Sequence, residues 1–226
     1  MPTQSYVGAC SKSAAPPLLP SYLANGDWDV VHRVPINTLR PTQSSVGMKS
    51  VSAKVRRIGF HLSNKRKFDR YLERRAIPVV LGPGRDFYMI DRHHLGMALH
   101  QSEVTEAYVA VLADFSAISR GSFFSCMERN GLLHPFDRSG KRIKPARLPK
   151  RIADLAHDPY RDLAWSVRRL GGFKKTAKPF SEFRWADFFR TRIAPETIER
   201  DYDKAVRSAL QLARTRQARA LPGFAA

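Results

Sequence analysis

Asp91, His93 and His94 are the residues of this chain whose types and spacing most clearly suggest chemistry. An imidazole titrates near neutral pH, so it can act as a general base, contact a phosphate or bind a metal. A carboxylate two residues away adds a ligand for a divalent cation such as Mg²⁺ or Mn²⁺. Arg92 lies between them, and a guanidinium can hold a phosphate through two hydrogen bonds. The motif therefore predicts a phosphate site with Asp91, His93 and His94 as catalytic candidates, Arg92 as an anion ligand and Asp91 as a metal ligand.

The segments around this motif predict how the site is formed. Residues 77–81 are apolar and β-branched, residues 82–86 are turn-forming, and residues 87–90 are apolar again, which indicates a β-hairpin. Residues 93–100 read as the first turns of a helix. A strand that leads into a helix N-terminus directs free N–H groups and the positive end of the helix dipole at one point, which favours phosphate. Adjacent helical residues are about 100° apart. We therefore expect one histidine to face the pocket and the other to cap or pack.

This hairpin and motif resemble the ParB/sulfiredoxin superfamily, and most closely its ParB-like putative nuclease family. The resemblance implies an α+β fold, with a small mixed sheet and flanking helices followed by a helical C-terminal half. Members of the superfamily bind CTP, transfer phosphate, reduce sulfinic acids or cut DNA, so the fold alone does not select an activity. The further segments that carry the resemblance are residues 39–43, 158–161, 171–176 and 179–190.

The resemblance also bears on a kinase activity. In relatives that phosphorylate free serine, a glutamate base stands where this chain has Gln43, and an amide cannot take a proton from a hydroxyl at neutral pH. Those relatives carry Asp-Gly-His-His-Arg, whereas here Arg92 replaces the glycine and Leu95 replaces the arginine. The Gly-Glu-Arg-Arg signature of the CTP switches is also missing. In the family the segment that contains Arg40 and Gln43 lies beside the nucleotide pocket, so both are phosphate-binding candidates.

The charge of the chain indicates a polyanionic partner. Lys and Arg number 39 against 20 Asp and Glu, a net charge of +19 with a pI near 10.6. Such an excess favours nucleic acid first and a nucleotide second. Lys174 and Lys175, in a loop after the predicted helix stop at Gly171 and Gly172, are further phosphate candidates. The candidate nucleic-acid contacts form one basic stretch: Lys141, Arg142, Lys144, Arg147, Lys150 and Arg151.

Composition and patterning also predict the organisation of the chain. Residues 1–27 are rich in Ser, Ala and Pro and predict a disordered or extended tail. Residues 28–115 predict the ParB/sulfiredoxin-like α/β domain, and residues 116–226 a basic helical half packed on or beside it. In that half, a helical pattern runs from Leu148 to Gly171. A second begins at Pro195 and continues to about Arg219, with an apolar stripe that can pack internally or form a homodimer.

Two further features limit the function classes. No apolar run approaches the ~20 residues that a membrane-spanning helix requires, so we expect no membrane partner. With only two cysteines we expect no disulfide framework, which fits a cytoplasmic location. The aromatic residues of the second half more often form a core than a base-stacking surface; they are Trp165, Phe173, Phe180, Phe183, Trp185, Phe188 and Phe189.

Three functions remain after these arguments. The first is a metal-dependent nuclease or nucleotide hydrolase acting at residues 91–94. The second is a non-catalytic, partition-like module that binds DNA through the basic stretch. The third is a phosphotransferase resembling the free-serine kinases, which Gln43 makes the weakest of the three.

Overall fold

The computed structural model describes residues 30–225, in which a curled, mixed five-stranded sheet has the order β1-β6-β4-β5-β2. Strands β4 and β5 pair antiparallel through the five-residue loop 82–86, which confirms the predicted hairpin. The β1–β6 pair is also antiparallel, whereas β4–β6 and β2–β5 are parallel. All five residues of the central strand β4 are buried, as its β-branched composition predicts. The strands are β1 (His32–Pro35), β2 (Leu39–Pro41), β4 (Ile77–Leu81), β5 (Phe87–Met89) and β6 (Glu106–Asp114).

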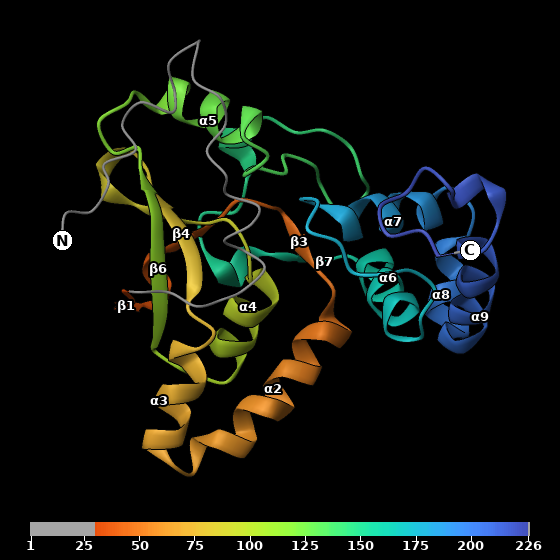
Figure 1. Ribbon diagram of the computed structural model, residues 1–226, viewed down its shortest axis with the longest axis horizontal. Coiled ribbons are helices and arrows are strands. Elements are labelled where there is room, and N and C mark those ends of the chain that lie inside the picture. The colour runs from red at the N-terminus through yellow and green to blue at the C-terminus, as the bar shows by residue number, and fades with distance from the viewer. Residues whose placement is uncertain (1–29, 226) are drawn as a thin grey trace.

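Helices pack on both sides of β4, and Figure 1 shows one of them across the top of the sheet and others below it and to its right. Because successive strand residues point to opposite faces, Val79 and Val80 of β4 belong to different cores. Val79 packs with α2 (Met48–Leu62), α3 (Lys65–Glu73) and α4 (His93–Gln101). Val80 packs with Phe123 and Met127 of α5 (Arg120–Arg129).

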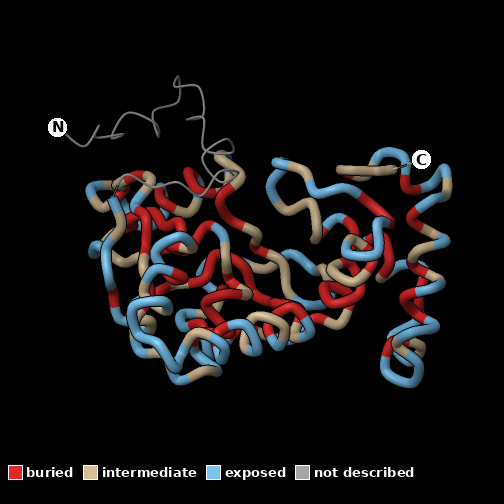
Figure 2. The backbone as a smooth tube through the Cα atoms, turned by 60° about the horizontal axis from the view of Figure 1, so that its bottom comes forward, coloured by how far each residue is buried: buried red, intermediate tan, exposed pale blue. Residues whose placement is uncertain are grey.

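The remaining helices form a second layer with its own core. Leu163, Trp185, Phe189 and Ala209 are fully buried there, and Figure 2 shows buried segments inside both the sheet part and this helical part. A short parallel pair, β3 (Ser45–Val46) with β7 (Ala156–His157), connects the two parts. The helices are α6 (Pro159–Arg169), α7 (Ser181–Arg190), α8 (Pro195–Arg200) and α9 (Tyr202–Ala213).

Both long helical patterns predicted for the second half are wrong in part. Between Leu148 and Gly171 the chain first forms a 3₁₀ turn at Ile152–Asp154 and then strand β7; α6 begins only at Pro159. The reason is local, because a residue that precedes proline is disfavoured in the α conformation. The Asp158 carboxylate then caps α6 by accepting from the Tyr160 N–H at 2.9 Å.

The second pattern, from Pro195, divides at Asp201. The extended backbone of Asp201 ends α8, and its carboxylate caps α9 by accepting from the Lys204 N–H at 2.9 Å. Helix α9 ends at Ala213, and a 3₁₀ turn follows at Arg216–Ala218. Its apolar stripe, including Ala205 and Ala209, is buried in the second core. A homodimer stays a prediction.

The other organisational predictions have different outcomes. The overall α+β class, a small mixed sheet with flanking helices and then a helical half, is confirmed. The predicted tail at residues 1–27 lies outside the described residues, and the domain boundary at residue 115 stays a prediction. Across residues 30–225, no helix is long and apolar enough to cross a membrane.

Candidate phosphate site

The turn before α4 has an unusual backbone conformation. Arg92 is the residue that precedes the helix, and it takes the left-handed region with φ 63°. That region is unfavourable for a residue with a Cβ atom and easy for glycine. Two hydrogen bonds hold the turn: the Arg92 N–H donates to Asp91 Oδ1 at 2.6 Å, and the Arg92 guanidinium donates to the Ala76 carbonyl at 2.8 Å. Arg92 therefore has a structural role, with part of its guanidinium already engaged.

His93 and His94 both bind backbone N–H groups of one loop. His93 Nε2 accepts from Thr42 N–H at 3.1 Å, and His94 Nε2 accepts from Gly47 N–H at 3.1 Å. Each imidazole therefore carries its proton on Nδ1. Burial, with the charge of Arg161, lowers the pKa of His93 to about 3, and the same causes hold the pKa of His94 well below its usual value.

These bonds correct the expectation for the two histidines. Each histidine lines the cavity and also binds the loop. The expected division, with one histidine in the pocket and the other packed elsewhere, is therefore wrong. Because Nε2 is occupied and both rings are neutral at neutral pH, they offer an Nδ1–H donor rather than a free basic nitrogen.

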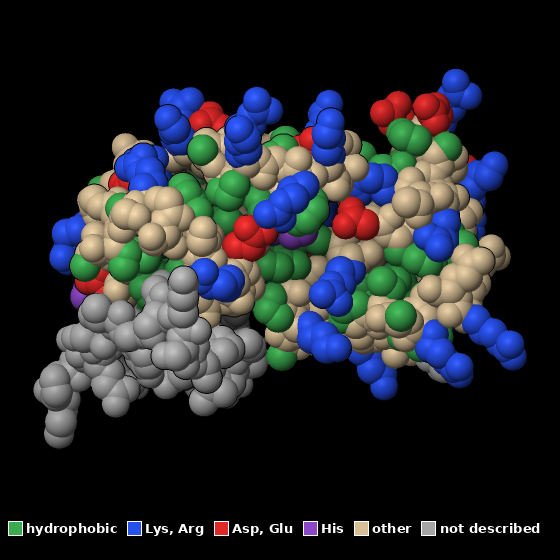
Figure 3. Space-filling view, turned by 90° about the horizontal axis from the view of Figure 1, so that it is seen from above, with side chains coloured by type: hydrophobic (Ala, Val, Ile, Leu, Met, Phe, Trp, Pro, Cys, Tyr) green, Lys and Arg blue, Asp and Glu red, His purple; other side chains and the backbone are tan. Residues whose placement is uncertain are grey.

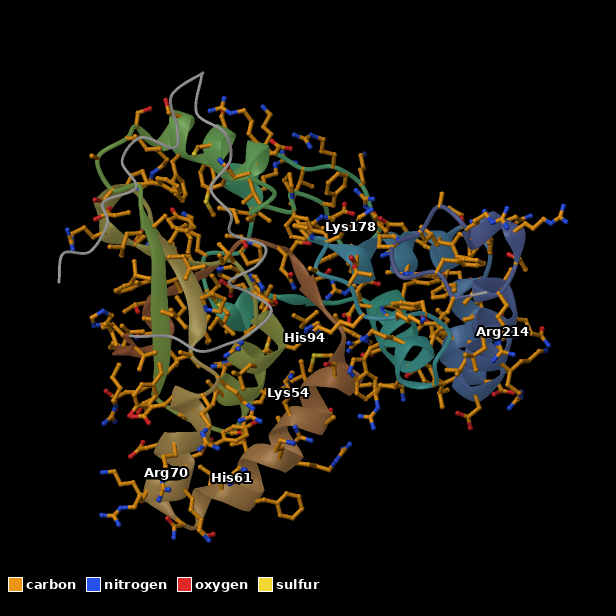
Figure 4. The ribbon with its side chains drawn as sticks, viewed as in Figure 1. Lys54, His61, Arg70, His94, Lys178 and Arg214 are labelled. Atoms are coloured by element: carbon orange, nitrogen blue, oxygen red, sulfur yellow. The ribbon has the colours of Figure 1, made fainter. Side chains whose placement is uncertain are left out.

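A cavity of about 720 Å³ opens in front of the motif. Its walls come from α2, the start of α4, α6 and the segment 173–183. Figure 4 shows Lys54 of α2 and His94 of α4 on facing elements at this cavity. Among the residues that the structure describes, Asp91 and Glu182 are the only two that contribute carboxylates to the lining. The cationic side chains that line it are Lys54, Arg74, Arg92, Arg161, Arg168, Lys174, Lys175 and Lys178.

Arg161 on α6 is the most informative of these cations. The residue is only 4% exposed, and its guanidinium lies 3.6 Å above the Phe183 ring. Its Nη2 is 3.8 Å from Glu182 Oε2, but Nε and Nη1 have no hydrogen-bond partner among the described residues. Buried donors are nearly always paired, and an unpaired one costs ~1–3 kcal/mol. Two unpaired donors in a cavity wall indicate the position of an anion.

The structure brings most of the predicted phosphate residues together. Asp91, Arg92, His93 and His94 line the cavity with Gln43, Lys174 and Lys175. Gln43 is buried, and its side-chain amide donates to the Ser45 carbonyl at 2.8 Å. Sequence reasoning missed Arg161, although the segment 158–161 carried part of the family resemblance, which was the available signal.

Other predicted residues lie elsewhere. Arg40 on β2 does not line the cavity, because its Nε pairs with Asp86 Oδ2 of the hairpin loop at 2.7 Å. The predicted nucleic-acid contacts are all exposed side chains outside the cavity wall: Lys141, Arg142, Lys144, Arg147, Lys150 and Arg151. Figure 3 shows how widely Lys and Arg side chains are spread over one face of the molecule.

The cavity is a poor match for a resident divalent cation. Within residues 30–225, no cluster of three or more His, Cys, Asp or Glu side chains is placed to hold a metal. Of the two cavity carboxylates, Glu182 pairs with Arg168 at 2.9 Å, so Asp91 is left among cations. Mg²⁺ and Mn²⁺ favour several oxygen ligands. The metal predicted from the sequence stays a prediction, and the reaction proposed below does not depend on a metal ion.

Comparisons with known proteins identify the family and the fold of the chain. The model of a family described as "Putative ParB-like nuclease" matches residues 32–191. The crystal structure of protein Atu1540 from Agrobacterium tumefaciens is similar, with a TM-score of 0.78 and 38% sequence identity. The similarity covers 87% of this chain and 98% of that one. No curated protein matches the chain.

Proposed function

Because the chain belongs to the putative ParB-like nuclease family, we propose that its cavity binds the phosphate of a nucleotide or nucleic acid and hydrolyses a phosphoester there. The observation that carries the proposal is Arg161, a buried guanidinium in the cavity wall whose Nε and Nη1 donors have no partner in the described part of the chain. A phosphate can accept from Nη1 or Nε together with the neighbouring Nη2, which is 3.8 Å from Glu182 and so not held by it in a hydrogen bond, because planar guanidinium groups bind phosphate through two parallel hydrogen bonds.

The remaining charges suit the same ligand. Phosphoryl transfer depends mainly on positioning and on stabilisation of negative charge, and eight Lys or Arg side chains surround this cavity against two carboxylates. Lys54 lies beside His94, and burial lowers the pKa of its ammonium group. A bound phosphate would reduce the electrostatic repulsion among these closely spaced cations.

Asp91 is the group in this cavity best suited to act as a base. It is exposed, unlike Glu182, and it is not ion-paired within residues 30–225. In the proposed reaction Asp91 takes a proton from water as the water oxygen bonds to phosphorus. The ester P–O bond breaks, and the leaving oxygen takes a proton from solvent. His93 and His94 contribute neutral Nδ1–H donors.

Binding is tested first, by calorimetry with inorganic phosphate, a nucleotide and an oligonucleotide. Arg161→Met keeps an unbranched side chain as far as the position of Nε and removes the charged guanidinium group, so we expect the affinity for each ligand that the wild type binds to fall ~10- to 100-fold. Arg207→Met removes an exposed arginine of α9 that does not line the cavity, and it should leave affinity unchanged. Equal losses in both variants, or no binding at all by the wild type, would contradict the proposal.

Hydrolysis is tested separately, with DNA, RNA and nucleotides, each with and without Mg²⁺ and Mn²⁺. Cleavage that disappears in Arg161→Met supports the hydrolase part of the proposal. If phosphate ligands bind but nothing is cleaved under any condition, the hydrolase part is wrong and only the binding part stands.

A second candidate function, DNA binding without catalysis, is favoured by the basic stretch. Arg142 pairs with Glu128 and Arg151 with Asp154. Lys141, Lys144, Arg147 and Lys150 are exposed and have no ion pair among the described residues. If they contact duplex phosphates, log affinity falls with log salt by ~0.9 per contact, and replacing all four with Gln reduces that slope. Salt-insensitive binding would exclude this role.

The position of Gln43 does not support the alternative function, a phosphotransferase that resembles the free-serine kinases. Gln43 lies in the cavity wall, but its amide is held by the Ser45 carbonyl and has no basic atom.

A further inference from the structure

We infer that the ligand of this cavity carries an unpaired nucleobase, which stacks on the indole ring of Trp165; this inference rests on the proposed phosphate binding. It narrows the ligand to a free nucleotide or a single-stranded segment. It excludes base-paired duplex, inorganic phosphate and sugar phosphates as the preferred ligands.

The first observation is the stripe that α6 presents to the cavity. Arg161, Trp165 and Arg168 follow one another at spacings of four and three residues, and all three line the cavity. Residues with this spacing share one face of a helix. The opposite side of α6 packs into the core through Leu163 and Val167.

The second observation is the distance along this stripe. Four residues of an α-helix advance ~6 Å along its axis, so the indole ring lies about one turn from the unpaired guanidinium donors of Arg161. A nucleotide likewise carries its base one sugar away from its phosphate. A phosphate on Arg161 would therefore bring the base of a nucleotide to the level of Trp165.

The third observation is that most other aromatic rings of this region are used in packing. Phe173 and Trp185 stack at 4.3 Å and are buried, and Phe183 lies under Arg161. For these rings the prediction of a core is confirmed. Phe173 and Phe183 also line the cavity but are buried, whereas Trp165 and Phe180 line it and are only half-buried, so that prediction does not extend to Trp165 and Phe180.

Trp165 also has a surface suited to stacking. The Arg169 guanidinium lies 4.9 Å from the centre of its ring, so a cation already contacts the aromatic system. The cavity, at about 720 Å³, is within the ~300–1,000 Å³ usual for small-molecule sites. Paired bases of a duplex are stacked on one another and cannot reach the ring, whereas every unpaired base offers a π face.

The test compares a phosphate ligand that carries a base with phosphate ligands that lack one. Affinities for a nucleoside 5′-monophosphate, ribose 5-phosphate and inorganic phosphate are measured by calorimetry, and tryptophan fluorescence is followed in parallel. Stacking of one base should favour the nucleotide over ribose 5-phosphate by ~5- to 150-fold and quench the fluorescence. An oligothymidylate and an abasic strand of equal length provide the same comparison for a polymeric ligand.

Two substitutions of Trp165 test whether the preference for a base comes from its indole ring. Trp165→Leu should abolish the preference for the base and keep the affinity for ribose 5-phosphate. Trp165→Phe should keep most of the preference and lose the quenching. If Trp165 has only a structural role, Trp165→Leu should instead lower the affinity for every ligand equally, and that result would overturn the inference.

The remaining outcomes separate the two proposals. If ligands with and without a base bind equally to the wild type, the inference is wrong while the proposed phosphate site stands. If no phosphate ligand binds, monomeric or polymeric, both are wrong.

Discussion

His93 Nε2 accepts a hydrogen bond from the backbone N–H of Thr42 at 3.1 Å, and both residues are buried. The Thr42 hydroxyl in turn donates to the Met89 carbonyl at 2.5 Å. Through these two bonds the start of α4 and the end of β5 hold the loop that follows β2. A histidine selected from the sequence for its chemistry thus joins three elements of the fold.

We expect His93→Ala to destabilise the protein as well as to alter the site. The substitution leaves the Thr42 N–H unpaired in a buried position and opens a cavity, so the free energy of unfolding should fall by ~2–4 kcal/mol. His93→Gln places an amide oxygen within reach of the same N–H and should recover part of that loss. Chemical denaturation measures both variants. Unchanged stability in His93→Ala would show that the Thr42 bond contributes little.

The stability of the protein should fall as the pH falls below about 6.5. Burial lowers the pKa values of His93 and His134 to about 3 in the folded protein, whereas an unfolded histidine titrates near 6.5. Between these values the unfolded chain binds more protons, so acid favours unfolding by up to ~1.4 kcal/mol per pH unit for each histidine. Denaturation at pH 7 and pH 5 tests this, and His93→Gln should reduce the dependence. Equal stability at both pH values would contradict the assignment.

Substitutions of Arg92 should separate backbone strain from side-chain bonding. Gly and Ala both remove the bond to the Ala76 carbonyl, but only Gly takes a φ of 63° freely. Arg92→Gly should therefore be more stable than Arg92→Ala by ~1 kcal/mol. Thermal unfolding of the two variants gives the comparison directly. A less stable glycine variant would mean that the turn changes conformation when the arginine is lost.

Asp91→Asn should abolish hydrolysis while ligand binding is retained. The amide oxygen can still accept from the Arg92 N–H, so the turn is kept, but an amide cannot take a proton from water. Turnover and affinity are measured on the same preparation. If Asp91→Asn cleaves as fast as the wild type, another group is the base, and Asp91 serves only to hold the turn.

Local sequence determined the elements around the site. The β-branched run 77–81, the turn residues 82–86 and the start of a helix at His93 depend on interactions between near neighbours, and each is present in the structure. The same local reasoning failed where a cap interrupted an apolar pattern, at Asp158 and at Asp201.

Only the tertiary structure decided which charged side chains share a cavity. Arg161 lies about 70 residues after Asp91, and the packing of α2 against both α4 and α6 brings the two residues to one cavity. Arg40 is separated from the site for the same kind of reason, because the pairing of β2 with β5 places Asp86 beside it. Charge and periodicity along a chain identify candidate residues, but burial and partnership depend on contacts between distant segments. Within residues 30–225, those contacts left two donors of Arg161 without a hydrogen-bond partner and used both histidine Nε2 atoms to hold a loop.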